Sequence, residues 1–120
     1  MSEKSVFSRI VDREIPADIV VETERLIAFR DISPKAPVHI LVVPKTPDYR
    51  NVAELAANDP ALLAELIAVA QDIADRECGG EYRLVFNTGA RSGQTVFHVH
   101  AHVLGAPAGG GLEEGTLASS

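Results

Sequence analysis

The segment FHVHAHVL, residues 97–104, alternates histidine with apolar residues and constrains the fold more than any other stretch. In a β-strand, successive side chains point to opposite faces, so residues two apart share a face. The segment therefore predicts a strand with one histidine face, made of His98, His100 and His102. The opposite face would consist of Val99, Ala101 and Val103. We expect the apolar face to pack in a core and the histidine face to carry chemistry.

Further segments have the composition of strands or the periodicity of helices. VHILVVP is β-branched and almost wholly apolar, which is typical of a strand buried on both faces, and His39 is its one polar residue. Asp59 is a good N-cap and Pro60 fits a first helical turn, so a long helix begins there and ends at Gly79 and Gly80. The predicted strands are 18–22, 25–32, 38–44, 82–87 and 97–104, and the predicted helices are 5–13 and 60–77. Strands grouped around one long helix predict an α+β fold with a mostly antiparallel sheet.

Length and composition are those of a single globular domain. The chain has 120 residues, of which 46% are hydrophobic and 23% charged, enough for one core and too few for two ordinary domains. We expect a domain over residues 1–105. The tail, 106–120, is rich in glycine and small residues, and we expect it to fray or to lie over the surface.

Charge and cysteine content narrow the partners and the compartment. The net charge of −6 argues against a nucleic-acid partner, because binding many phosphates needs a basic surface. No stretch approaches the ~18 apolar residues of a membrane span, and the charged start of the chain lacks an apolar secretory core. The single cysteine, Cys78, excludes an internal disulfide and favours a reducing compartment, so we expect a cytoplasmic protein.

Three explanations of the histidine row are open from the residues alone. Purely structural histidines are the default for one position, but three buried in register would each need hydrogen-bond partners. A zinc site could use neighbouring histidines with His39 as a third ligand, but the outer two lie roughly 13 Å apart along a strand. A phosphorylated ligand fits best, because imidazole can attack phosphorus and can hydrogen-bond to phosphoryl oxygens. We therefore expect neither a metal nor a cofactor.

Residues beside the row fit a phosphorylated ligand. In SGQT, residues 92–95, glycine lets backbone N–H groups approach an anion, and Thr95 adds a hydroxyl. Asn87 ends a predicted strand and could reach the phosphate or cap its own turn. Asp31 could accept two ribose hydroxyls or cap the turn that follows it. The residues alone leave these alternatives open.

The motif HVHAHVL resembles the signature of the histidine triad (HIT) superfamily. SRIVDREIPADIVVETERLIAFRDISPKAPVHILVVPK, YRLVFNTG and SGQTVFHVHAHVLG resemble its Hint branch, the histidine triad nucleotide-binding proteins, from about residue 5 to 105. The resemblance implies a five-stranded antiparallel sheet with one long and one short helix. It implies a homodimer with a continuous ten-stranded sheet. It also implies hydrolysis of purine nucleoside phosphoramidates to AMP or GMP and an amine.

The resemblance further implies a role for each candidate residue. His100 would be the nucleophile that forms a covalent nucleotidyl-histidine, His102 would contact the phosphate, and His39 and His98 would orient the site or pass protons. Asp31 would bind the ribose hydroxyls. The phosphate would be held by Asn87, Thr95 and the backbone near Gly93 and Gln94. The base pocket would be formed by Val6, Phe7, Ile10, Ile15, Phe29, Arg30 and Ile32.

Two features depart from the Hint pattern. Thr95 stands where the branch commonly has serine, and GQTV also resembles the Fhit branch, which cleaves dinucleoside polyphosphates; Asn87 and RDISPKAP favour Hint. The chain contains no tryptophan, whereas many Hint proteins have one in a C-terminal segment that reaches the partner's site. Two alternatives to a phosphoramidase therefore remain. One is a dinucleoside polyphosphate hydrolase, and the other is a purine-nucleotide-binding scaffold dimer with little catalysis.

Overall fold

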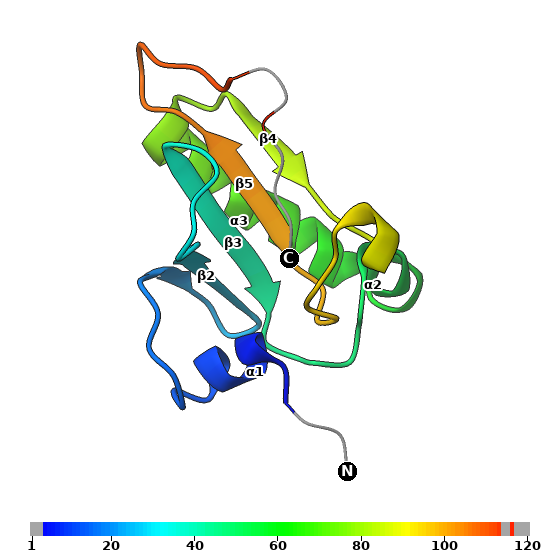
Figure 1. The fold of residues 1–120 in the computed structure, drawn as a ribbon. Coiled ribbons are helices and arrows are strands. Elements are labelled where there is room, and N and C mark those ends of the chain that lie inside the picture. Colours follow the sequence, from blue (N-terminus) through cyan, green and yellow to red (C-terminus); the bar gives the residue numbers. More distant parts are fainter. Residues whose placement is uncertain (1–3, 114–115, 117–120) are drawn as a thin grey trace.

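The computed structural model describes residues 4–113 and 116 of the chain. Five antiparallel strands form one sheet in the order β1-β2-β3-β5-β4 (Figure 1). The strands are β1 (Ile19–Glu22), β2 (Leu26–Arg30), β3 (Val38–Pro44), β4 (Tyr82–Val85) and β5 (Ala101–Gly105). The predicted α+β class and the five-stranded antiparallel sheet are confirmed.

The described chain has three α-helices, whereas the sequence predicts one short and one long helix, over 5–13 and 60–77. The helices are α1 (Val6–Val11), α2 (Val52–Asn58) and α3 (Pro60–Cys78). At Asp59 the backbone leaves the helical range, with φ −147° and ψ 70°, and the carboxylate accepts the amide of Leu62 as the N-cap of α3. Because Pro60 has no N–H to continue the hydrogen bonds of α2, the two helices stay separate.

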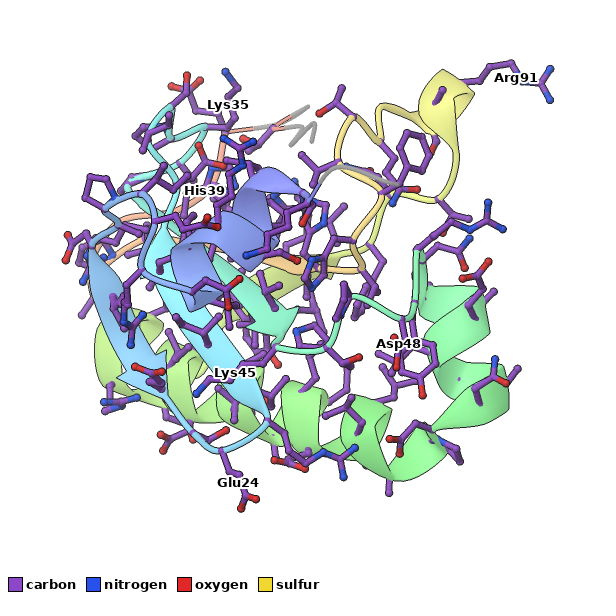
Figure 2. All side chains as sticks on the ribbon, turned by 90° about the horizontal axis from the view of Figure 1, so that it is seen from below. Glu24, Lys35, His39, Lys45, Asp48 and Arg91 are labelled. Atoms are coloured by element: carbon purple, nitrogen blue, oxygen red, sulfur yellow. The ribbon has the colours of Figure 1, made fainter. Side chains whose placement is uncertain are left out.

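Helices α1 and α3 cover opposite faces of the sheet (Figures 1 and 2). The larger core, under α3, includes Leu62, Leu66, Ala70, Ile73, Ile40, Val42, Ala101 and Val103. The smaller cluster, under α1, consists of Phe7, Ile10, Ile27, Phe29, Leu41 and Val43. Burial of each large apolar side chain contributes roughly 1.5–3 kcal/mol. Strand β3 takes part in both clusters and is buried along its whole length, as its apolar sequence predicts.

The last strand is shorter than predicted, because β5 begins at Ala101 rather than at residue 97. In the register with β3, Val42 pairs with Ala101. If the ladder continued, Val43 and Pro44 would pair with His100 and Val99, which precede β5. Pro44 has no amide hydrogen to donate there, and the ladder stops. The preceding segment is held instead by a loop, through the amide of Val99, which donates to the Tyr49 carbonyl at 2.9 Å.

Strand β4 is also shorter than the predicted strand over residues 82–87. Strand β4 ends at Val85, so Asn87 lies two residues beyond the strand. The described part of the tail contains no helix or strand, and Arg83 donates to the carbonyl of Thr116 at 3.0 Å. Residues 114–115 and 117–120 of the predicted tail lie outside the described residues.

Among the described residues, no helix combines the length and the apolar composition needed to cross a bilayer.

Candidate active site

Four imidazole rings lie together on the α1 side of the sheet. The ring centroids of His100 and His102 are 5.1 Å apart, and those of His102 and His39 are 5.2 Å apart. Phe7 of α1 meets His100 edge-on at 4.8 Å and His98 at 6.0 Å. None of the four histidines is more than 4% exposed. The three histidines of the motif therefore share one side, as the alternation predicts, although only His102 lies in a strand.

Backbone carbonyls decide which nitrogen carries the proton in His98 and His100. Nδ1 of His100 lies 2.8 Å from the carbonyl oxygen of His98, and Nε2 of His98 lies 2.7 Å from that of Pro44. A carbonyl oxygen can only accept, so these two nitrogens are the protonated ones. In a neutral imidazole the other nitrogen has the lone pair. The lone pair of His100 is therefore on Nε2, and that of His98 is on Nδ1.

His39 and His102 form a second chain of hydrogen bonds. The backbone amide of Lys35 donates to Nδ1 of His39 at 3.0 Å, so Nε2 of His39 carries the ring proton. This Nε2–H donates to Nδ1 of His102 at 3.0 Å and lies 3.5 Å from a carboxylate oxygen of Asp31. His102 then carries its own proton on Nε2. The row thus has an acceptor nitrogen on His100 beside a donor nitrogen on His102.

Burial favours the neutral form of His39, His98 and His102. It lowers the pKa of His98, although the hydrogen bond to the Pro44 carbonyl opposes the shift. It also lowers the pKa of His39, against the effect of the Asp31 carboxylate, which raises it. For His102, burial and repulsion from His100 and His39 lower the pKa to about 3. Neutral rings keep their lone pairs at physiological pH.

The side chains of Asp31, His39 and His102 bring three potential metal-ligand atoms within 4.8 Å of one another. Their hydrogen bonds oppose cation binding. A metal at Nε2 of His39 would force the ring proton onto Nδ1, which already faces the Lys35 N–H donor. The chemistry of these donors favours the hydrogen-bonded chain over a metal centre.

A pocket of about 420 Å³ opens beside the row, between α1, the end of β2 and the following loop. Figure 2 shows His39 on this side of the sheet, away from α3. Every residue predicted for the nucleoside lines it: Val6, Phe7, Ile10, Ile15, Phe29, Arg30, Asp31 and Ile32. The lining also includes residues that were not predicted, namely Pro16, Ala17, Ser33, Lys35, Leu41 and Val96. Another pocket, of about 350 Å³, lies among Cys78, Glu81–Arg83 and Gly105–Leu112 and holds none of the predicted site residues.

The rim of the 420 Å³ pocket is apolar and open. Ile32 is 99% exposed and Val6 is 43% exposed, so a flat apolar ligand would gain contact area by covering them. Asp31 caps the turn after β2 by accepting the amide of Ser33 at 2.7 Å, and it also lines the pocket. The guanidinium of Arg30 forms two hydrogen bonds of 3.0 Å to Glu77, so it brings no unpaired charge to the pocket.

The residues predicted to hold a phosphate lie in the loop between β4 and the row, outside the lining of that pocket. Thr95 is exposed and Asn87 is half-buried. Gly93, with φ 103°, and Gly89, with φ 90°, adopt backbone conformations that favour glycine. The backbone N–H groups of Gly93 and Gln94 donate within the loop, to the carbonyls of Ala90 at 3.1 Å and Gly89 at 3.2 Å, so they stabilise the loop itself.

The side chain of Gln94 is a structural part of this loop. It is 2% exposed. The amide oxygen accepts the N–H of Gly89 at 2.9 Å, and the amide nitrogen donates to the carbonyls of Arg50 at 2.7 Å and Val96 at 3.0 Å. Gln94 thus joins the loop to the segment that precedes α2, which lies beside it in Figure 1.

Several groups that orient the row or the loop beside it were not among the predicted residues. They are the hydroxyl of Ser5, the amide of Lys35 and the carbonyls of Pro44, Tyr49 and Arg50. A serine directly before an apolar helical segment is a visible N-cap signal, so Ser5 could have been found as a cap. A backbone carbonyl has no sequence signal for the side chain that it meets.

Comparison with known proteins identifies the family. A model described as the HIT domain matches residues 12–108. The chain belongs to the HIT domain family. A purine nucleoside phosphoramidase of Escherichia coli K12 is 45% identical to this HIT protein over 107 residues, covering 88% of the chain and 89% of the relative. An uncharacterized HIT-like protein of Synechococcus elongatus is 52% identical over 106 residues, covering 88% of the chain and 92% of the relative.

Solved structures agree with this assignment. The crystal structure of a HIT family hydrolase from Legionella pneumophila superimposes with a TM-score of 0.83 at 37% sequence identity, covering 95% of this chain and 100% of that one. The family membership inferred from the histidine motif is confirmed. The relatives support hydrolase activity for this HIT protein.

Proposed function

We propose that this HIT protein is a purine nucleoside phosphoramidase, which releases AMP or GMP through a covalent nucleotidyl-histidine. The observation that carries the proposal is the hydrogen bond between Nδ1 of His100 and the carbonyl oxygen of His98. It puts the lone pair of His100 on Nε2 and gives that ring the form of a nitrogen nucleophile. The E. coli relative that is named a phosphoramidase supports the choice of substrate class.

In the first step, Nε2 of His100 would attack the phosphorus of the substrate. A bond forms between Nε2 and phosphorus, the P–N bond of the substrate breaks, and the amine takes up a proton as it leaves. The ring is then cationic, and the His98 carbonyl stabilises it by accepting its Nδ1–H. In the second step, water attacks phosphorus, the bond to Nε2 breaks, and a proton is released as the nucleoside monophosphate forms.

The neighbouring groups would stabilise charge on the phosphoryl oxygens. The Nε2–H of His102 is held in place by its bond from His39, so it can donate without reorganisation. The hydroxyl of Thr95 and the carboxamide of Asn87 would supply further donors from the loop.

The 420 Å³ pocket would hold the nucleoside. Asp31 would accept the ribose hydroxyls, and the base would lie among the apolar side chains that line the pocket and cover Ile32. Pockets of this size that combine an apolar lining with a few polar groups are typical of small-molecule sites.

Incubation with adenosine 5′-phosphoramidate tests the proposal. AMP should form, and rapid quenching should trap a nucleotide on His100. The variant His100→Asn should lose turnover by a factor of about 10⁴ or more, as nucleophile removal does elsewhere, while still binding AMP. Full activity in that variant would show that His100 is not the nucleophile.

A second candidate function is a dinucleoside polyphosphate hydrolase that uses the same histidine. Thr95 favours it, because GQTV resembles the Fhit branch. The ratio of kcat/KM on adenosine 5′-phosphoramidate to that on diadenosine triphosphate separates the two activities. Tight AMP binding with turnover of neither substrate would favour the nucleotide-binding scaffold.

We also propose a homodimer with a continuous ten-stranded sheet. Strand β4 is at the end of the strand order, so among the described residues its outer edge pairs with no strand. Ile67 of α3 is 38% exposed, so the helix presents a large apolar side chain that a partner could cover. Sedimentation equilibrium should give twice the chain mass. A cytoplasmic location and the absence of nucleic-acid and membrane partners remain predictions.

A further inference from the structure

The hydroxyl of Ser5 joins helix α1 to the histidine row. Its oxygen accepts the backbone N–H of Ser8 at 3.0 Å, which makes Ser5 the N-cap of α1. The same oxygen lies 2.8 Å from Nδ1 of His98. Because the Pro44 carbonyl keeps the His98 proton on Nε2, Nδ1 is an acceptor and the Ser5 O–H is the donor.

Helix α1 depends on contacts of this kind. It has only six residues, Val6–Val11, and a helix of that length is unstable by itself. Its apolar contacts come from Phe7 and Ile10, and its hydrogen bond to the row comes from Ser5. The hydroxyl of Ser8 is a weaker second contact, at 3.4 Å from Nδ1 of His98.

The position of α1 matters because of Phe7. Its ring lines the 420 Å³ pocket and lies 5.6 Å from the ring of Phe29. The same ring meets His100 edge-on at 4.8 Å. A shift of α1 would therefore move the apolar wall of the pocket.

We propose that Ser5 is a positioning residue for nucleobase recognition, which acts by holding α1 and its pocket wall against His98. The inference rests on the proposed function, because it takes the ligand of the pocket to be a nucleoside 5′-phosphate. Both ring nitrogens of His98 are engaged, by Pro44 and Ser5, so His98 serves as the fixed attachment of α1 and not as a proton carrier.

Calorimetric titration of the full chain with AMP and with ribose 5-phosphate tests this role. The dissociation constant of ribose 5-phosphate divided by that of AMP measures the contribution of the base. Ser5→Ala should reduce that ratio about fivefold to tenfold through weaker AMP binding, with ribose 5-phosphate binding unchanged. Ser5→Thr, which keeps the hydroxyl, should retain the ratio of the unmodified protein.

Two controls separate this role from a general loss of helix stability. Asn51→Ala removes the N-cap of α2, a helix that does not line the pocket, and should leave the ratio unchanged. The side chains of valine and threonine have nearly the same shape, and only threonine has a hydroxyl. If Ser5→Ala folds poorly, Ser5→Val and Ser5→Thr therefore give the same test of the Ser5 hydroxyl. The nitrogen-15 chemical shift of His98 Nδ1 should change in Ser5→Val and stay near its original value in Ser5→Thr.

The outcomes that would overturn the inference are distinct from failure of the proposed function. An unchanged AMP to ribose 5-phosphate ratio in both Ser5→Ala and Ser5→Val would refute the role of Ser5 and leave phosphoramidase activity unaffected. Equal losses in Ser5→Thr and Ser5→Val would also refute it. An unmodified protein that binds neither ligand would overturn the role of Ser5 together with the proposed function.

Discussion

The Nε2–H of His39 donates to Nδ1 of His102 at 3.0 Å, between the central strand β3 and its neighbour β5. The two residues are diagonal neighbours in the ladder, because His39 pairs with Leu104 and Leu41 pairs with His102. Long and aromatic side chains can meet across such a diagonal. The hydrogen bond determines the tautomer of His102 and keeps its remaining N–H directed away from His39.

Loss of this donor should slow the reaction more than it weakens binding. In His39→Leu, the buried Nδ1 of His102 loses its partner, which costs about 1–3 kcal/mol and should lower kcat about 5- to 150-fold. His39→Gln, whose side-chain amide can still donate, should keep more activity. Steady-state kinetics on adenosine 5′-phosphoramidate check both variants. An unchanged kcat in His39→Leu would contradict the role of the hydrogen bond.

Gln94 should be essential to the shape of the loop between β4 and β5. In Gln94→Glu, a carboxylate oxygen would replace the nitrogen that donates to the carbonyls of Arg50 and Val96. The buried repulsion should lower the free energy of unfolding by roughly 3 kcal/mol or more and weaken AMP binding. Gln94→Met has a similar volume and no charge, so its loss should be smaller. Urea denaturation gives both values, and two variants as stable as the unmodified protein would show that these hydrogen bonds matter little.

Ile32 should affect ligand binding without affecting stability. Its side chain is 99% exposed, so Ile32→Ala removes almost no buried contact from the free protein. If the base covers this residue, the lost apolar contact should weaken AMP binding by roughly 1 kcal/mol, about fivefold. Thermal unfolding without ligand should be unchanged, and ribose 5-phosphate binding serves as the control. AMP affinity equal to that of the unmodified protein would place the base elsewhere.

Stability should fall as the pH drops below about 6.5. The pKa of His102 is lowered to about 3 in the folded chain, so between these values the unfolded chain binds more protons than the native one. From pH 6.5 to pH 5, His102 alone should cost roughly 2 kcal/mol of unfolding free energy. His39 and His98, whose pKa values are also lowered, act in the same direction.

Urea denaturation between pH 8 and pH 5 measures this dependence. The free energy of unfolding should be nearly constant above pH 7 and decline below it. Replacement of His102 by asparagine should make the decline shallower, because one titrating group is removed. The same slope in both proteins would mean that His102 does not contribute.

Local sequence patterns were sufficient to predict the sheet, the long helix and the shared side of the three motif histidines. Side chains alternate with a period of two in residues 97–104, so Val99 packs in the core under α3 and His98 packs against Phe7 on the α1 side. This holds even though the first half of the segment is not in a strand. The continuous apolar composition of 38–44 and the Asp59-Pro60 boundary likewise depend only on neighbouring residues. The apolar residues predicted for the lining of the 420 Å³ pocket, such as Phe7 and Ile32, came from the resemblance to the HIT family and not from periodicity.

Tertiary structure decided the chemistry of each histidine. The tautomer of an imidazole depends on which donor or acceptor faces each nitrogen, and the partners found here are the carbonyls of Pro44 and His98, the amide of Lys35 and the hydroxyl of Ser5. Pro44 and Ser5 are 54 and 93 positions from His98 along the chain. No local pattern encodes contacts over such separations, because they arise only when the sheet and α1 have packed.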